Sequence, residues 1–197
     1  MENKVVSFKT AGDLPFTMLE RLKDAGKNYG LESIYPFAAE DIIVAEWVSL
    51  KCRYGCSLYN RSWCCPPATP GPDKVRQILA EYTQAILLRS SHYLPKFYQD
   101  DSRKRSALVR CWKGTISLER LLFLSGYHKA FSLVGERCAL CKKCVYPNNC
   151  RFPQEKRPSV ESFSIDVVGT LHRLGIKPEV ATDINEPFTY YAIILVS

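Results

Sequence analysis

The stretch Ala130-Phe-Ser-Leu-Val-Gly-Glu-Arg-Cys-Ala-Leu-Cys-Lys-Lys-Cys144 joins a short apolar segment to a run of closely spaced cysteines. Its first five residues are mostly apolar and are followed by a glycine, which predicts a β-strand at residues 130–134. The cysteines begin soon after this strand ends. In α/β sheets, ligands usually bind just outside the carboxyl ends of the strands. We therefore expect this cysteine loop to hold a ligand at one edge of a sheet.

The spacing of these cysteines favours an iron–sulfur cluster. Cys138, Cys141 and Cys144 stand at steps of three, so each thiolate can reach a different iron of one cuboidal cluster. A structural zinc ion usually draws on two separated C-x2-C pairs, and the middle thiolate of this run would fit such a site poorly. Zinc remains the alternative, followed by a metal-free role. Five residues precede the next cysteine, Cys150, which completes the same cluster or serves elsewhere.

A second cysteine segment spans residues 51–67, and its cysteines are Cys52, Cys56, Cys64 and Cys65. Its start resembles the C-x3-C-x2-C loop that leaves one iron open for a sulfonium cofactor, but Tyr59 occupies the third position, so that class of radical enzyme is excluded. Pro66 and Pro67 prevent a regular helix beyond the last cysteine. We expect three or four metal-binding thiolates on this loop, with a metal-free structural loop as the alternative.

Helical and strand patterns alternate along the rest of the chain. Apolar periodicity and capping residues predict helices at residues 14–28, 72–82, 102–125 and 159–174. Short apolar or β-branched runs predict strands at residues 42–48, 85–88, 130–134 and 190–196. This order predicts a single α/β domain over residues 1–197: a mixed β-sheet flanked by helices, with two cysteine-rich metal-binding loops, 51–67 and 137–158, at one sheet edge.

Several short strings, in the same order along the chain, carry a family resemblance. They are Lys51-Cys-Arg-Tyr-Gly-Cys56, Tyr59 with Ser62, Cys65-Pro-Pro67, Leu118-Glu119, Gly126-Tyr-His-Lys-Ala-Phe131, Cys138-x2-Cys141-x2-Cys144, Cys150-Arg-Phe-Pro153, Arg157-Pro-Ser159 and Ile165-Asp-Val167. Together they resemble the DUF2284 family of predicted metal-binding proteins. The resemblance implies metal binding of an iron–sulfur kind, without one settled activity. It also favours Cys65 over Cys64 as a ligand.

Counting ligands leaves one place open. Two cubane clusters with four thiolates each need about eight cysteines. The positions that the resemblance favours, as cofactor and metal ligands, number seven: Cys52, Cys56, Cys65, Cys138, Cys141, Cys144 and Cys150. The eighth ligand is then Cys64, Cys111, a non-cysteine group or none, which would leave an open iron. Cys111 lies on the apolar stripe of the helix at 102–125, which favours a buried core role.

The net charge has to be corrected for bound metal. The formal charge of +7 counts every cysteine as neutral, whereas a cubane with four thiolates carries about −2, so two would leave about +3. Basic residues beside the cysteines then offset thiolate charge. A nucleic-acid partner is not favoured, because the basic residues at 103–113 are more typical of a solvated helix face.

Composition and the absence of other motifs narrow the function. The chain is 46% hydrophobic and 24% charged, and it has no signal-peptide core and no apolar run near the ~18 residues that a membrane span needs, so we expect a cytoplasmic protein. It has no phosphate-binding glycine loop, dinucleotide fingerprint or serine nucleophile motif. We predict one or two [4Fe–4S] clusters that act in electron transfer with a redox protein partner, or in an unidentified redox or sulfur-handling step. The alternative is a zinc-stabilised binding module whose basic surface meets an anionic or nucleic-acid partner.

Overall fold

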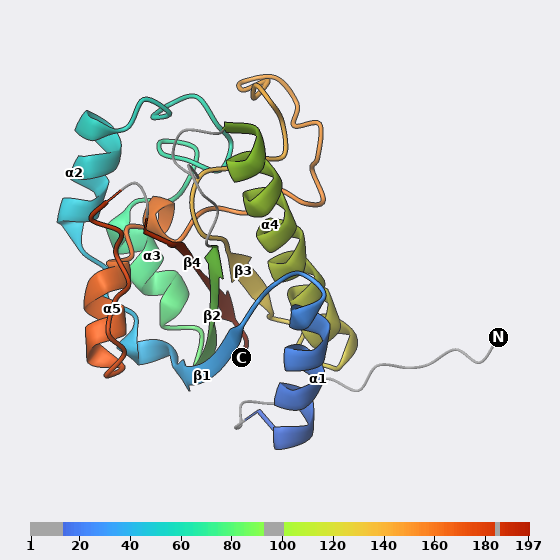
Figure 1. Cartoon of the computed structure of the whole chain (residues 1–197). Coiled ribbons are helices and arrows are strands. Elements are labelled where there is room, and N and C mark those ends of the chain that lie inside the picture. The colour runs from blue at the N-terminus through green and yellow to red at the C-terminus, as the bar shows by residue number, and fades with distance from the viewer. Residues whose placement is uncertain (1–13, 93–100, 184–185) are drawn as a thin grey trace.

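The computed structural model describes residues 14–92, 101–183 and 186–197, and its helices and strands alternate along the chain (Figure 1). The helices are α1 (Phe16–Lys27), α2 (Glu46–Gly55), α3 (Pro72–Leu79), α4 (Asp101–Leu124) and α5 (Val167–Arg173), with short 3-10 helices η1 (Ala39–Asp41) and η2 (Glu161–Phe163). The strands are β1 (Ser33–Ala38), β2 (Gln84–His92), β3 (Phe131–Leu133) and β4 (Phe188–Leu195). The α/β class is confirmed. None of the described helices combines the length and the apolar character that crossing a bilayer requires.

The sheet has four strands in the order β1-β2-β4-β3 among the described residues. All three strand pairs are antiparallel, so the expectation of a mixed sheet was wrong. The pairing of Ala38 with Gln84 explains part of this result. The connection 39–83, which carries the first cysteine segment, begins and ends at the same end of the sheet. The two strands that it joins, β1 and β2, therefore run antiparallel.

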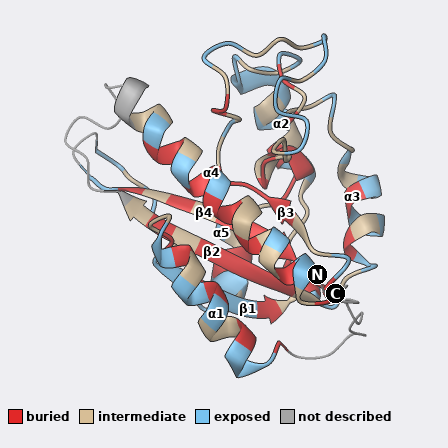
Figure 2. Ribbon diagram, turned by 90° about the vertical axis from the view of Figure 1, so that its right-hand side faces the viewer, coloured by how far each residue is buried: buried red, intermediate tan, exposed pale blue. Residues whose placement is uncertain are grey.

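The two faces of the sheet bury two separate parts of the core. Successive side chains of a strand point to opposite faces, so Ile86 and Leu88 pack toward α1 and α4, while Ala85 and Leu87 pack toward α3 and α5. β2 and β4 are accordingly coloured as buried over most of their length in Figure 2. The result is a three-layer arrangement in which the long helix α4 covers one face.

Two predicted elements are different in the structure. Residues 42–48 do not form a strand of the sheet: Val44 makes only an isolated bridge to Ile165, and α2 begins at Glu46. Cys52 therefore lies on a helix. The helix expected at 159–174 is divided, because Ser164 adopts a left-handed conformation with φ 58°, and α5 begins only after Asp166, whose side chain accepts a hydrogen bond from the Gly169 N–H at 2.9 Å.

Gly135 makes the close approach between the end of β3 and β4 possible. A Cβ at this position would collide with the backbone carbonyl oxygen of Tyr191 and would lie 2.8 Å from Cε2 of Tyr190. We expect Gly135→Ala to lower the free energy of unfolding by about 3 kcal/mol, because backbone must move to relieve the overlap. Urea titration followed by circular dichroism measures this loss.

The matched control is Gly55→Ala at the end of α2, where a Cβ would meet no atom within 4 Å. That variant should keep the stability of the parent or gain up to about 1 kcal/mol from higher helix propensity. Equal midpoints for the two variants would show that the contact between Gly135 and Tyr191 does not constrain the fold.

Candidate metal centre

The two cysteine segments lie side by side at one end of the molecule, at the top of both Figure 1 and Figure 2. Direct contacts join them. The Trp63 indole N–H donates a hydrogen bond to the carbonyl oxygen of Asn148 at 2.8 Å, and the ring centroids of Trp63 and Tyr146 are 5.0 Å apart. The Tyr146 hydroxyl also donates to the Asn60 side chain at 3.2 Å. Segments far apart in the sequence therefore form one structural unit.

Five cysteines line one narrow cavity between the two segments. One comes from the first segment and four from the second: Cys64, Cys138, Cys141, Cys144 and Cys150. Apolar and aromatic side chains complete the lining, among them Trp63, Leu140 and Phe152. All nine cysteines of the chain are free of disulfides, so these thiols are available as donors.

Cys64 and Cys138 contact each other directly within this group. Their side chains are hydrogen-bonded, which raises the pKa of the buried Cys64 thiol and lowers the pKa of Cys138 to about 7. The pair therefore favours one thiolate, on Cys138, and one proton, on Cys64. Backbone N–H groups support the sulfurs as well: Leu140 donates to Cys138, and Phe152 donates to Cys150 with 3.4 Å between nitrogen and sulfur.

The other three cysteines of the first segment form a neighbouring group. Cys52 lies on α2, Cys56 follows the last residue of α2, and Cys65 lies in the turn beyond it. Burial is the main cause that raises the pKa of Cys65 to about 11; a hydrogen bond with Ser62 opposes the rise, and the nearby thiols of Cys56, Cys52 and Cys138 contribute to it. Because Cys65 interacts with both groups, the five-cysteine cavity and this three-cysteine group adjoin.

The comparison with known families agrees with this gathering of thiols. Residues 36–196 match the model of the family described as predicted metal-binding protein (DUF2284). The chain belongs to the DUF2284 family. The resemblance seen in the sequence is thus confirmed, and the family is one for which metal binding is predicted. No curated protein and no solved structure matches the chain.

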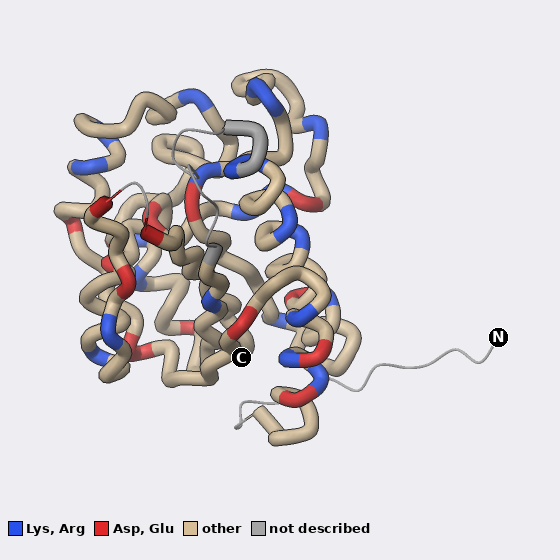
Figure 3. The backbone as a smooth tube through the Cα atoms, viewed as in Figure 1, with Lys and Arg blue, Asp and Glu red and all other residues tan. Residues whose placement is uncertain are grey.

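Positive charge surrounds the cysteines of this DUF2284 protein. Lys and Arg residues occur along both loops in Figure 3. The Arg105 guanidinium donates from Nη2 to the carbonyl oxygen of Leu140 at 2.9 Å, inside the C-x2-C-x2-C loop, and its buried Nε has no hydrogen-bond partner among the described residues. Lys156 lies over the Trp63 ring at 5.1 Å. Clustered cysteines, N–H donors to sulfur and a buried guanidinium N–H without a partner among the described residues together suit an anionic metal–thiolate group.

The structure brings together all seven cysteines that the sequence put forward and adds Cys64. Cys111 is 0% exposed and belongs to the core between α1, α4 and the sheet. It does not line the cavity, which agrees with its expected core role. Among the described residues, no three histidine, cysteine or acidic side chains converge tightly enough to hold a single metal ion.

The sequence did not predict the positions of two residues near the cysteines, Cys64 and Glu161. Cys64 adjoins Cys65, and nothing in the sequence shows that their side chains face different groups. Glu161 interacts electrostatically with Cys52, and burial raises the pKa of Glu161 to about 7. The one feature of the sequence that could have indicated them is their position: Cys64 lies within the first cysteine segment, and Glu161 follows the second.

Proposed function

We propose that this DUF2284 protein binds two [4Fe–4S] clusters through eight cysteines and acts in electron transfer or in a related redox or sulfur-handling step. The observation that carries the proposal is the single cavity that Cys64 shares with the four cysteines of the second segment. A cavity lined with thiols from two distant segments suits a metal group, because such a group binds the deprotonated thiolates and offsets the repulsion between them.

The number of thiols supports two clusters. Five line the cavity and three form the adjoining group. Two four-thiolate clusters use these eight when Cys64, which also interacts with Cys65, joins the group of three. Cys64 takes the place that the seven family-like positions left open. Cys111 cannot take it without leaving the core, where it is fully buried.

The surroundings of the cysteines fit electron transfer. When bound, a [4Fe–4S] cluster gains and loses one electron at a potential set by nearby charge, hydrogen bonds to sulfur and exposure to solvent. In this chain, the N–H groups of Leu140 and Phe152 donate to sulfur, and Trp63 limits the access of water. Lys142 and Lys143 are exposed beside the ligands, so we propose a redox protein partner with an acidic face, in the cytoplasm.

Metal and sulfide analysis of protein purified without oxygen tests the proposal. The expected sample is brown and contains about eight irons and about eight acid-labile sulfides per chain. A colourless protein that holds only stoichiometric zinc would contradict the proposal and would support the zinc-stabilised binding module instead.

A further inference from the structure

A second cavity, of about 490 Å³, lies between α4 and residues 154–157, and its lining contains no cysteine. Its volume is within the range of about 300–1,000 Å³ that is typical of small-molecule sites. Ile116, Phe123 and Ala130 give it an apolar part, while charged side chains supply the rest. The iron–sulfur proposal uses none of these residues.

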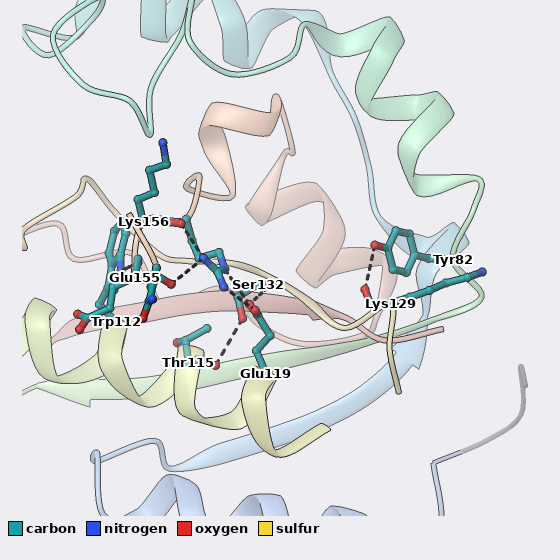
Figure 4. Close-up of polar contacts among 10 residues, drawn as sticks. Tyr82, Trp112, Thr115, Glu119, Lys129, Ser132, Glu155 and Lys156 are labelled. Carbon is teal, nitrogen blue, oxygen red and sulfur yellow. Dashed lines mark hydrogen bonds and ion pairs between the residues drawn. The ribbon is translucent and has the colours of Figure 1, made fainter. Parts of the chain in front are cut away.

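A fixed ion pair forms one wall of this cavity. Arg157 donates to Glu119 through Nε at 2.9 Å and through Nη2 at 2.6 Å, and the Ser132 N–H donates to the same carboxylate at 2.8 Å. The side chains of Arg157 and Glu119 are only 17% and 12% exposed. Figure 4 shows Glu119 reaching from α4 toward Ser132. This bidentate geometry holds the guanidinium rigidly and neutralises its charge.

Arg157 keeps one donor for a ligand. Its Nη1 group donates to the carbonyl oxygens of Gln154 and Lys156, at 3.2 Å and 2.8 Å. An arginine has five N–H donors, and these bonds, with the two to Glu119, account for four of them. The remaining N–H, on Nη2, has no acceptor among the described residues.

Two further cations line the same cavity. Lys113 and Arg120 are both exposed and lie two turns apart on one face of α4. Neither forms an ion pair with a described acidic residue. Because Arg157 and Glu119 neutralise each other, these two cations against the single carboxylate of Glu155 give the cavity a net positive charge, which attracts an anion.

Glu155 provides an acceptor that the protein leaves unused. Its backbone carbonyl accepts a hydrogen bond from the Trp112 indole N–H at 2.7 Å, which fixes the residue against α4 (Figure 4). Its Oε2 atom is buried and has no hydrogen-bond partner in the described part of the chain. A buried acceptor without a partner is unfavourable, so a ligand that donates an N–H or O–H here would be stabilised.

We propose that this cavity binds a small carboxylic acid that also carries an amino group. Lys113, Arg120 and the free N–H of Arg157 take the carboxylate, and Glu155 accepts from the amino group. The apolar part contacts the carbon chain of the ligand. This inference is independent of the metal centre, because its residues are not metal ligands.

Isothermal titration calorimetry of the full metal-loaded chain tests the inference with two probes. Glutamate carries carboxylates and an ammonium group, and glutarate carries the same carboxylates without a donor for Glu155. We expect glutamate to bind about tenfold more tightly than glutarate, as one buried charged hydrogen bond predicts. The double variant Lys113→Ala/Arg120→Ala should weaken both probes at least about tenfold, and Glu155→Gln should abolish the difference between them.

Lys74→Ala is the matched control, because Lys74 is an exposed cation on α3 outside the cavity; its affinities should equal those of the parent. The inference is overturned if neither probe binds, if the double variant binds both as well as the parent does, or if glutamate and glutarate bind equally. Iron content is measured on every sample. Unchanged iron together with lost selectivity separates a failure of this inference from a failure of the iron–sulfur proposal.

Discussion

Cys64→Ser is expected to lower the iron content of anaerobically reconstituted protein from about eight to about four per chain, with an equal loss of sulfide. The reason is the ligand count: Cys64 is 3% exposed and interacts with Cys65, and without it only Cys52, Cys56 and Cys65 remain for the second cluster. A serine hydroxyl is a poor ligand for iron in a cluster that thiolates normally hold. Iron and sulfide assays per chain measure the effect.

Cys111→Ala is the matched control for this prediction. Cys111 is as deeply buried as Cys64 but belongs to the core around α4. This variant should keep its full iron content while its thermal unfolding midpoint falls, because it leaves a small cavity in the core. If Cys64→Ser kept as much iron as Cys111→Ala, Cys64 would not be a ligand.

Removal of the metal is expected to open both cysteine loops to protease. Residues 56–71 and 135–158 contain neither helix nor strand, and the buried apolar cluster beneath them has only four members: Cys64, Trp112, Val134 and Leu140. Under the proposed function, metal binding supplies much of the free energy that orders these loops. We expect trypsin to cut after Lys142, Lys143 and Arg151 at least about tenfold faster in chelator-treated protein than in loaded protein.

Cleavage after Lys27, at the exposed end of α1, serves as the internal reference. Its rate should not depend on metal, because α1 lies at the end of the molecule opposite the cysteine loops (Figure 1) and packs through its own apolar face. Cys141→Ser should be cut in the loop about as fast as chelator-treated protein, even with iron present. Identical loop cleavage with and without metal would show that the loops are ordered by the protein alone.

Local patterns predicted most of the helices and strands. The apolar periodicity of α4 and the compact apolar runs of β2 and β4 depend on neighbours in sequence, so they are visible without a structure. The prediction of a strand at residues 42–48 was wrong because their conformation depends on contacts with residues far away in the sequence. They are β-branched, but Ile43 and Ala45 form backbone hydrogen bonds with Asp166 and Ser164 of a distant loop, not with the sheet, and only tertiary structure decides that.

The candidate metal ligands likewise divide into those that local sequence predicts and those that only the tertiary structure distinguishes. The spacing of Cys138, Cys141 and Cys144 predicts a metal loop from local sequence alone. The choice between Cys64 and Cys65 depends on which way two adjacent side chains point, and the structure directs one toward each group of thiols. The antiparallel direction of the strands could not be predicted either, because a connection as long as 39–83 can bring the next strand into the sheet in either direction.

Native mass spectrometry of protein kept free of oxygen tests the central claim most directly, since it weighs the intact chain with whatever it holds. The account predicts a main species heavier than the bare chain by the mass of two [4Fe–4S] clusters, and a Cys64→Ser species that has lost one of them. A bare chain, or a chain carrying only zinc ions, would contradict it.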